Sequence, residues 1–465
     1  MTAQTILPAN SVVDSGFNVA NSVRYNDGDS PHLNINFGSD GTLNKWTFSM
    51  WFKRSTLGTA QRLFCVLDSG IDDYIKFGTD DKIEWGFDHE DSNRGILITN
   101  RVFRDVSAWY HLVCRLDTTN GTAGDRMRMY INGVEETSFA TDTNPPEDAT
   151  GDIGRDNNHY IGSSGSSQYF DGYFAEVCMI NNQSLAPTSF GEFDEDSGIW
   201  KPIDVSDLTP GTNGFYLDFE ASDNLGNDAF GGTDWGETNL AATDQTTDTC
   251  TNNFATMNNL ETSPYAIVFS QGNTEVVGSG GNGGRITLGT IAPSSGKWWC
   301  EVKMLNVVGS YPIVGIIDSQ SSLKMDAVYF VDSGQDANNR SGYALFSNSD
   351  VYNNGDNNFG DFVQTYTTND IIGVGLDMDA STPTLTFQKN GSSEKTFTTE
   401  IPPSGFYNFP AIGFYFAAAK VSVNFGNPSF SISSGNTDGN GYGNMEYAVP
   451  SGYYSLNTKN LAEFT

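Results

Sequence analysis

In several stretches of the chain, large apolar residues recur at every second position. Residues 45–52 read KWTFSMWF, residues 109–116 read WYHLVCRL, residues 297–304 read KWWCEVKM and residues 370–379 read DIIGVGLDMD. A period of two is typical of a β-strand with one buried face. The pattern therefore predicts strands with these inward faces: Trp46, Phe48, Met50 and Phe52; Tyr110, Leu112, Cys114 and Leu116; Trp298, Cys300, Val302 and Met304; Ile372, Val374, Leu376 and Met378.

Two of the strand patterns run into an Asn-Gly pair, at Asn132-Gly133 and at Asn390-Gly391. Asn-Gly is the preferred corner of a two-residue type I′ hairpin, because both corner residues need a positive φ. The same dipeptide recurs at Asn120, Asn213, Asn282 and Asn440, so the flanking strands carry the prediction. We expect a β-hairpin at each of the first two positions.

Few segments show a 3.6-residue apolar repeat, and 50 glycines punctuate the 465 residues. We therefore predict an all-β protein of two antiparallel, jelly-roll-like β-sandwiches in tandem, with very little helix. The expected boundaries are residues 1–205 for the first sandwich, 206–262 for a connector and 263–465 for the second sandwich. The connector contains one strand, Phe215–Phe219. We expect it to pack on the first sandwich, because Trp235, Leu240 and Phe254 would otherwise lie in solvent.

The formal net charge is −33, from 57 acidic and 24 basic residues. Such a surface repels nucleic-acid phosphate and anionic lipid, so neither is an expected partner. Either the carboxylates simply keep the protein soluble, or some of them gather around Ca²⁺.

Five cysteines are scattered at positions 65, 114, 178, 250 and 300, without a CxxC pair. Zinc, a redox pair and a disulfide framework are therefore not expected. Residues 1–12 lack the basic and apolar regions of a secretory signal, and no apolar run approaches the length of a membrane span. We expect a protein made in the cytoplasm of its host cell, without membrane insertion.

Four segments in a fixed order, FSMWF, WYHLVCRL, MYING and FDGYFAEVCMI, resemble the laminin-G-like, concanavalin A-type sandwich over residues 13–200. The succession WWCEVKM, VGII, GYALF, NDIIGVGLDMD, LTFQKNG, FPAIGF and VNFG resembles the SPRY domain. The SPRY resemblance implies a bent two-sheet sandwich that binds protein partners through variable loops and has no catalytic set. The connector (NLAATDQTTDTCTNNFATMN) and the C-terminal tail resemble parts of virion-associated proteins of marine bacterial viruses.

Candidate catalytic residues are few. Some concanavalin A-type glucanases use a Glu-x-Asp-x-x-Glu strand, and the nearest approach here is Glu192-Phe193-Asp194-Glu195-Asp196-Ser197. Ser197 occupies the place of the second glutamate, which would be the acid/base, and flanking glycines indicate a loop. We therefore expect no catalytic residues and no required cofactor.

Candidate metal ligands are equally sparse. The four histidines, His32, His89, His111 and His159, show no ligand spacing, and His111 is expected to be structural. Two acidic clusters could hold Ca²⁺ at the rim of the first sandwich, although plain solvated loops are the alternative. They comprise Asp68, Asp72 and Asp73, and Asp152 and Asp156 with Asp171.

Three further features have competing interpretations. Trp51 and Trp299 lie out of phase with the core faces, so each is either a sugar-stacking residue or covered by a loop. Residues 347–361 have the composition of a long loop, which either recognises a partner or is merely solvated. The run Gly278–Gly284 lacks Gly-Lys-Ser/Thr and precedes strands, which argues against a phosphate loop.

The leading hypothesis is a non-enzymatic bacteriophage virion protein on the tail or head, which binds host-surface glycans or neighbouring virion subunits. The alternative is a purely structural capsid-decoration or tail-assembly subunit, and a polysaccharide-degrading enzyme is a third hypothesis. A cellular adhesin is a fourth. Exposed sheet edges favour association into a homo-oligomer, for example a trimer, but no heptad repeat points to a coiled coil.

Overall fold

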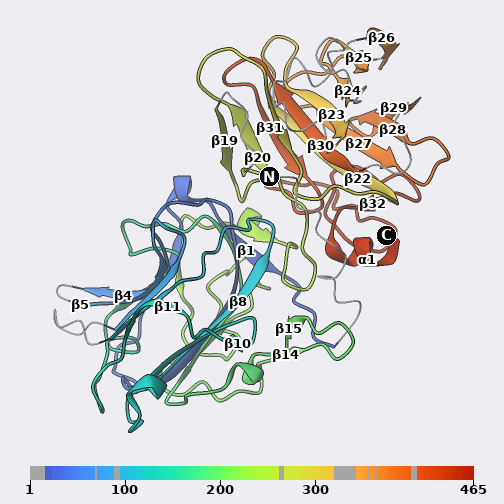
Figure 1. Cartoon of the computed structure of the whole chain (residues 1–465). Coiled ribbons are helices and arrows are strands. Elements are labelled where there is room, and N and C mark those ends of the chain that lie inside the picture. The colour runs from blue at the N-terminus through green and yellow to red at the C-terminus, as the bar shows by residue number, and fades with distance from the viewer. Residues whose placement is uncertain are drawn as a thin grey trace. The chain divides into compact units, whose positions relative to one another are not determined.

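The computed structural model of the protein describes residues 16–68, 71–87, 95–260, 266–318, 342–353, 356–362, 364–399 and 406–464. Within these ranges strands dominate (Figure 1), and the one α-helix is α1 (Thr458–Phe464). The all-β prediction is therefore confirmed. The described residues form two compact units, 16–251 and 252–464, which we call the first and the second module. No described helix is long and apolar enough to cross a membrane.

The first module contains two large antiparallel sheets, named here after a central strand. The β3 sheet has the order β10 (Val134–Glu135), β9 (Met127–Ile131), β8 (Trp109–Asp117), β3 (Lys45–Arg54), β13 (Gly172–Asn181), β1 (Ser22–Tyr25) and β18 (Gln245–Thr246), and β16 (Phe215–Leu217) also pairs with β13. The β4 sheet has the order β11 (Phe139–Thr143), β7 (Gly95–Thr99), β6 (Ile83–Phe87), β5 (Ile71–Phe77), β4 (Gln61–Asp68), β12 (Asn158–Ile161), β2 (His32–Asn36) and β17 (Gly236–Thr238). A separate hairpin joins β14 (Gly191–Phe193) to β15 (Trp200–Pro202). Short 3₁₀ turns cover Asp27–Asp29, Ala123–Asp125, Pro187–Ser189 and Ala242–Asp244.

The core of the first module lies between its two sheets. The predicted inward faces of β3 and β8 pack there, with Tyr110 partly buried and the others buried, together with Phe64, Ile75 and Trp85 from the β4 sheet. The opposite face of the β3 sheet is also covered. Residues after β13, among them Phe190, Val205 and Trp200, pack against its outward side chains.

The second module is again a two-sheet sandwich. One sheet has the order β19 (Ile267–Ser270), β20 (Glu275–Gly278), β31 (Lys420–Asn424), β22 (Lys297–Asn306), β27 (Ile371–Asp377), β28 (Thr384–Lys389) and β29 (Ser392–Thr398), and β32 (Tyr454–Ser455) pairs with β22. The other has the order β21 (Arg285–Leu288), β30 (Tyr407–Phe414), β23 (Ile313–Asp318), β24 (Gly342–Leu345), β25 (Asp350–Asn353) and β26 (Asp356–Asp361). The predicted inward faces of β22 and β27 are buried in its core.

Both predicted Asn-Gly hairpins are confirmed. Val134 pairs with Ile131 around Asn132 (φ 48°) and Gly133 (φ 76°). Ser392 pairs with Lys389 around Asn390 (φ 48°) and Gly391 (φ 71°). Both corners have the positive φ values of a type I′ turn.

Two expectations are corrected. Residues 347–361 are not a long loop, because β25 and β26 form a hairpin there and β25 pairs with β24. Pairing to an existing strand outweighs the low strand propensity of Asn, Asp and Gly. Phe254 is buried in the core of the second module, whereas Trp235 and Leu240 pack in that of the first.

Candidate functional site

Two half-buried tyrosines face outward from the β4 sheet of the first module. The strand register aligns Tyr160 of β12 with Cys65 of β4, Cys65 with Tyr74 of β5, and Tyr74 with Gly86 of β6. Side chains alternate between faces, and the neighbouring Ile75 points into the core. The two tyrosines are therefore two strand spacings apart on the outer surface, about 9–10 Å between backbones.

Two ion pairs surround Tyr74. Arg62 binds Asp72 through both Nη atoms, at 2.8 and 2.9 Å, and its guanidinium carbon lies 4.5 Å from the centre of the Tyr74 ring. Lys76 Nζ lies 4.7 Å from the same ring centre and 2.9 Å from Glu84 Oε2. We call Tyr74, Tyr160 and these four charged residues the tyrosine strip. Its two cations and two anions make it locally neutral in a chain of net charge −33.

Glycines let both tyrosine rings lie close to the backbone. A Cβ atom at Gly86 would be 2.6 Å from Tyr74 Cε1, and one at Gly165 would be 2.8 Å from Tyr160 Cζ. Cys65, between the rings, is fully buried, and its thiol donates to the Ser163 carbonyl at 3.3 Å. Burial raises the pKa of this thiol to about 12, so the cysteine is a packing group and not a nucleophile.

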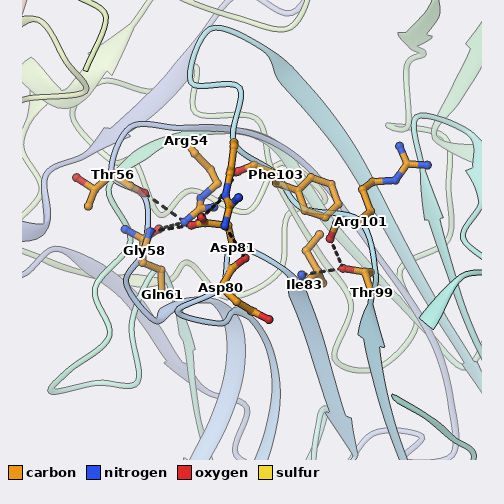
Figure 2. A network of polar contacts seen from close by, with 11 residues as sticks. Arg54, Thr56, Gly58, Gln61, Asp80, Asp81, Ile83, Thr99, Arg101 and Phe103 are labelled. Carbon is orange, nitrogen blue, oxygen red and sulfur yellow. Dashed lines mark hydrogen bonds and ion pairs between the residues drawn. The ribbon is translucent and has the colours of Figure 1, made fainter. Parts of the chain in front are cut away.

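A buried Arg–Asp pair ties together three loops at one end of the first module (Figure 2). Arg54 Nη1 donates to Asp81 Oδ1 at 3.1 Å and to the Phe103 carbonyl at 2.9 Å. Asp81 also accepts from the Gly58 amide at 2.7 Å and from Arg104 Nε at 2.7 Å. Burial opposes ionisation of Asp81, but these donors hold its pKa below the usual range. The network positions the loops, and its charged groups bond to one another and to the backbone.

His111 is held inside the first module. Trp200 Nε1 donates to His111 Nδ1 at 2.9 Å, and because an indole N–H only donates, the imidazole proton lies on Nε2, 2.8 Å from Ser49 Oγ. Trp51 stacks on the imidazole with ring centres 4.7 Å apart. Burial lowers the pKa of His111 to about 3, so the ring stays neutral and structural.

Neither out-of-phase tryptophan is exposed. Trp51 is 4% exposed beside His111, and Trp299 is fully buried with its ring centre 6.0 Å from that of Tyr453. The loop-covered alternative is therefore the correct one for both.

Three of the candidate Ca²⁺ ligands, Asp72, Asp73 and Asp152, are engaged in internal contacts. Asp72 pairs with Arg62, Asp73 accepts from the Asp152 amide at 2.6 Å, and Asp152 Oδ1 lies 2.8 Å from Arg155 Nε. Asp68 and Asp156 are exposed. Within the described ranges, no three His, Cys, Asp or Glu side chains are grouped so that they could hold a metal ion.

Two buried carboxyl groups on or beside β13 have raised pKa values. Burial raises the pKa of Asp171 to about 7, although Thr56 donates to it. Glu176, which no sequence pattern singled out, has a left-handed φ of 51° at a bulge in β13. Tyr216 Oη donates to it at 2.6 Å. Burial, reinforced by Asp218, Glu220 and Asp204, raises the pKa of Glu176 to about 8.

The glucanase-like segment lies on the β14–β15 hairpin. Asp194 accepts from the amide and hydroxyl of Ser197 at 2.9 and 2.8 Å, and these bonds lower its pKa to about 2. Lys201 Nζ lies 3.2 Å from Asp194 and 3.3 Å from Glu192. An acid/base carboxyl needs a raised pKa, whereas the surroundings of Asp194 lower its pKa.

The glycine-rich run after β20 wraps an arginine. Arg285 donates to the carbonyls of Ser279 (2.7 Å), Gly281 and Gly283 (3.2 Å). Phosphate loops present backbone N–H groups to an anion, whereas here carbonyl oxygens surround a cation. This geometry agrees with the argument against a phosphate loop.

Comparisons with known proteins identify both modules. Residues 27–187 match the concanavalin A-like lectin/glucanases superfamily, and residues 297–428 match the SPRY domain. No curated protein matches the chain. Among solved structures, a native heptameric SAP-like pentraxin from Limulus polyphemus is 15% identical, with 37% of this chain and 80% of that chain covered and a TM-score of 0.29.

Two further solved structures are similar to parts of the chain. The SPRY domain of human HERC1 is 20% identical, with 32% of this chain and 87% of that chain covered and a TM-score of 0.25. A proposed carbohydrate-binding protein from Bacteroides ovatus is 13% identical, with 48% of this chain and 60% of that chain covered and a TM-score of 0.33. The family matches show that the chain carries a concanavalin A-like lectin/glucanase domain followed by a SPRY domain, both of them β-sandwiches.

Proposed function

We propose that the protein is a non-enzymatic carbohydrate-binding component of a bacteriophage virion, and that the tyrosine strip contacts a neutral host-surface glycan. The observation that carries the glycan proposal is the pair of outward tyrosines with a fixed, charge-balanced polar frame. Aromatic rings offer an apolar face to the C–H groups of a sugar, while side chains with fixed orientation accept and donate hydrogen bonds to its hydroxyls.

The geometry of the strip favours an extended ligand. Tyr74 and Tyr160 are about 9–10 Å apart across β4, a span that a short oligosaccharide covers. Arg62 and Asp72 hold each other through two hydrogen bonds, so little side-chain freedom is lost when a ligand arrives. Because the strip is locally neutral and the whole chain is acidic, a neutral glycan meets less repulsion than a polyanionic one.

Three further parts of the proposal come from the sequence and the site chemistry. The virion setting is supported by the resemblance of the connector and the tail to virion proteins. The absence of catalysis is supported by Asp194 and Glu192, which both pair with Lys201, and by Ser197, which stands where an acid/base glutamate would be needed. We also propose that no Ca²⁺ is required, since the described carboxylates of the strip pair with Arg62 and Lys76.

The test is native gel electrophoresis of the full chain through gels that contain a neutral β-glucan, mannan or galactan. Retardation in at least one gel is expected, unchanged by a chelator. Tyr74→Ala or Tyr160→Ala should weaken binding about 5- to 10-fold, because each variant removes part of an apolar contact. Phe193→Ala is the matched control, since Phe193 is a 49% exposed aromatic on the β14–β15 hairpin.

Two outcomes would contradict the proposed glycan-binding, non-enzymatic function. If the wild-type chain is not retarded by any neutral polysaccharide but is present in fixed stoichiometry on purified virus particles, the structural decoration role replaces the glycan-binding role. If reducing ends are released from a polysaccharide and Glu192→Ala abolishes their release, the protein is an enzyme.

A further inference from the structure

The second module carries a continuous cluster of five aromatic side chains at its surface. Tyr311, Phe346, Tyr352, Tyr415 and Phe416 are all half-buried. Ring centres are 4.5 Å apart for Phe346 and Tyr352, and 5.7 Å apart for Tyr311 and Phe346. Tyr311 is 5.9 Å from both Tyr415 and Phe416, which are 5.2 Å from each other. We call these five residues the aromatic cluster.

Three separate segments bring the rings together. Tyr311 precedes β23, Phe346 and Tyr352 flank the β24–β25 turn, and Tyr415 and Phe416 follow β30. The rings are therefore neighbours only because β23 pairs with both β24 and β30. No spacing in the sequence reveals the cluster.

Buried hydrogen bonds hold these segments in place. The hydroxyl of Tyr366, which is 1% exposed, lies 2.6 Å from the Pro312 carbonyl oxygen and 3.1 Å from the Leu345 carbonyl oxygen, and its single proton is shared between them. A Cβ atom at Gly309 would lie 2.5 Å from Phe416 Cε2, so this ring rests directly on the backbone. A surface fixed in this way binds without a large ordering cost.

The chemistry of the cluster indicates the class of ligand. Three of its rings carry hydroxyls, and the segments 307–312, 346–352 and 414–419 contribute Ser310, Ser347, Asn348, Ser349 and Asp350 but no Lys or Arg. An anionic ligand would find no cation in these segments and would face the −33 charge of the chain. A neutral ligand with both apolar faces and hydroxyl groups suits the cluster, and a neutral sugar has that chemistry.

We infer that the aromatic cluster is a second binding site for neutral glycan, separate from the tyrosine strip of the first module. This inference rests on the proposed glycan-binding function, but it adds a site in the SPRY domain that uses different residues. A chain with two such sites gains avidity on a surface that displays many glycans.

The test uses the full chain and the same native gels with β-glucan, mannan or galactan. A double variant Tyr311→Ala/Phe416→Ala is compared with Tyr74→Ala/Tyr160→Ala, with the control Phe193→Ala and with the wild type. Each double variant should retain part of the binding, with affinity lowered about tenfold, and the quadruple variant should not be retarded. Gly309→Ala, which displaces Phe416 without removing a ring, should weaken binding in the same direction.

Folding of each variant is checked by its calorimetric transitions, so that loss of binding is not confused with unfolding. If the wild type is retarded, Tyr74→Ala/Tyr160→Ala abolishes all retardation and Tyr311→Ala/Phe416→Ala changes nothing, the proposed function stands and the second site is overturned. If the wild type itself is not retarded, the proposed function fails and the second site fails with it.

Discussion

At the scale of single residues, Asp171 and Glu176 show how burial in the first module changes acid chemistry. Both carboxyl groups lie on or beside β13, and their pKa values are raised to about 7 and about 8. Tyr216 donates to Glu176, whereas Asp218 and Glu220 oppose its ionisation. At pH 7 the Glu176 carboxyl therefore keeps its proton, whereas the Asp171 carboxyl is about half protonated.

These raised pKa values predict that the first module becomes less stable as pH rises. Above its ordinary pKa each group loses its proton in the unfolded chain but keeps it in the folded one, so unfolding is favoured until pH passes the folded pKa. Burial lowers the pKa values of His111 and His159 to about 3 and about 4. These histidines make the folded module more stable as pH rises, but only below about pH 6.5, where they are protonated in the unfolded chain. Between pH 7 and 8 most of the decline therefore comes from Glu176, at about 1 kcal/mol per pH unit, because a carboxyl with a pKa of about 8 is partly ionised in this range.

Glu176→Gln should remove most of the decline between pH 7 and 8, because the amide does not titrate. Asp171→Asn is the matched control and should preserve most of the decline, since the contribution of Asp171 fades as pH rises through about 7. Urea unfolding followed by tryptophan fluorescence at several pH values measures the effect. An unchanged slope between pH 7 and 8 in Glu176→Gln would show that Glu176 is already ionised in the folded protein.

At the scale of elements, the two Asn-Gly hairpins show what a turn requires. Gly133 and Gly391 have positive φ values, which glycine adopts without strain. Each is also covered by a ring. A Cβ atom at Gly133 would lie 2.2 Å from Trp200 Cε3, and one at Gly391 would lie 2.5 Å from Tyr447 Cδ1. The hairpins are thus fixed by local conformation and by packing.

Gly133→Ala should destabilise the first module by about 1 kcal/mol through the left-handed backbone and by about 1–3 kcal/mol more through the clash with Trp200. Gly121→Ala is a close control, because Gly121 also follows an asparagine but a Cβ atom there would meet nothing within 4 Å. Its effect should stay within about 0.5 kcal/mol. If urea unfolding shows that Gly133→Ala and Gly121→Ala lose the same free energy of unfolding, this account of the hairpin is contradicted.

At the scale of the whole molecule, the chain has two large cores that share no residue. Each core lies between the two sheets of its own module, so each can unfold as a cooperative unit. Fold alone does not assign function, and the two candidate binding sites accordingly use different residues on different sheets.

Differential scanning calorimetry should therefore resolve two unfolding transitions in the full chain. Gly133→Ala should lower the midpoint of one transition, and Gly391→Ala should lower that of the other, because Trp200 and Tyr447 belong to different modules. A single transition that both variants shift equally would show that the modules unfold together.

Much of the fold could be predicted because strand periodicity and turn chemistry are local properties. The inward faces of β3, β8, β22 and β27 follow directly from residues that alternate along the chain. The prediction of a loop at residues 347–361 was wrong, since their pairing with β24 depends on a partner elsewhere in the sequence. Phe254 was assigned to the wrong core for a related reason, because apolar character alone does not identify which core a residue joins.

The candidate sites were far less predictable. Trp51 and Trp299, chosen from their phase, are buried, while Tyr74 and Tyr160 become neighbours only through the register of β5, β4 and β12. Alternation in β5 could have indicated that Tyr74 points outward, but not that Arg62 lies over its ring. No sequence pattern indicated the raised pKa of Glu176, because it depends on Tyr216 and on the layer that covers the β3 sheet.

The sequence by itself determined the all-β class, the two sandwiches and their hairpin corners, because alternation and positive φ depend on neighbouring residues. Only the tertiary structure decided which aromatic rings are exposed, which carboxyl groups keep their protons and which loops meet. Those properties depend on burial and on contacts between residues distant in the chain. The tyrosine strip and the aromatic cluster are both of this second kind.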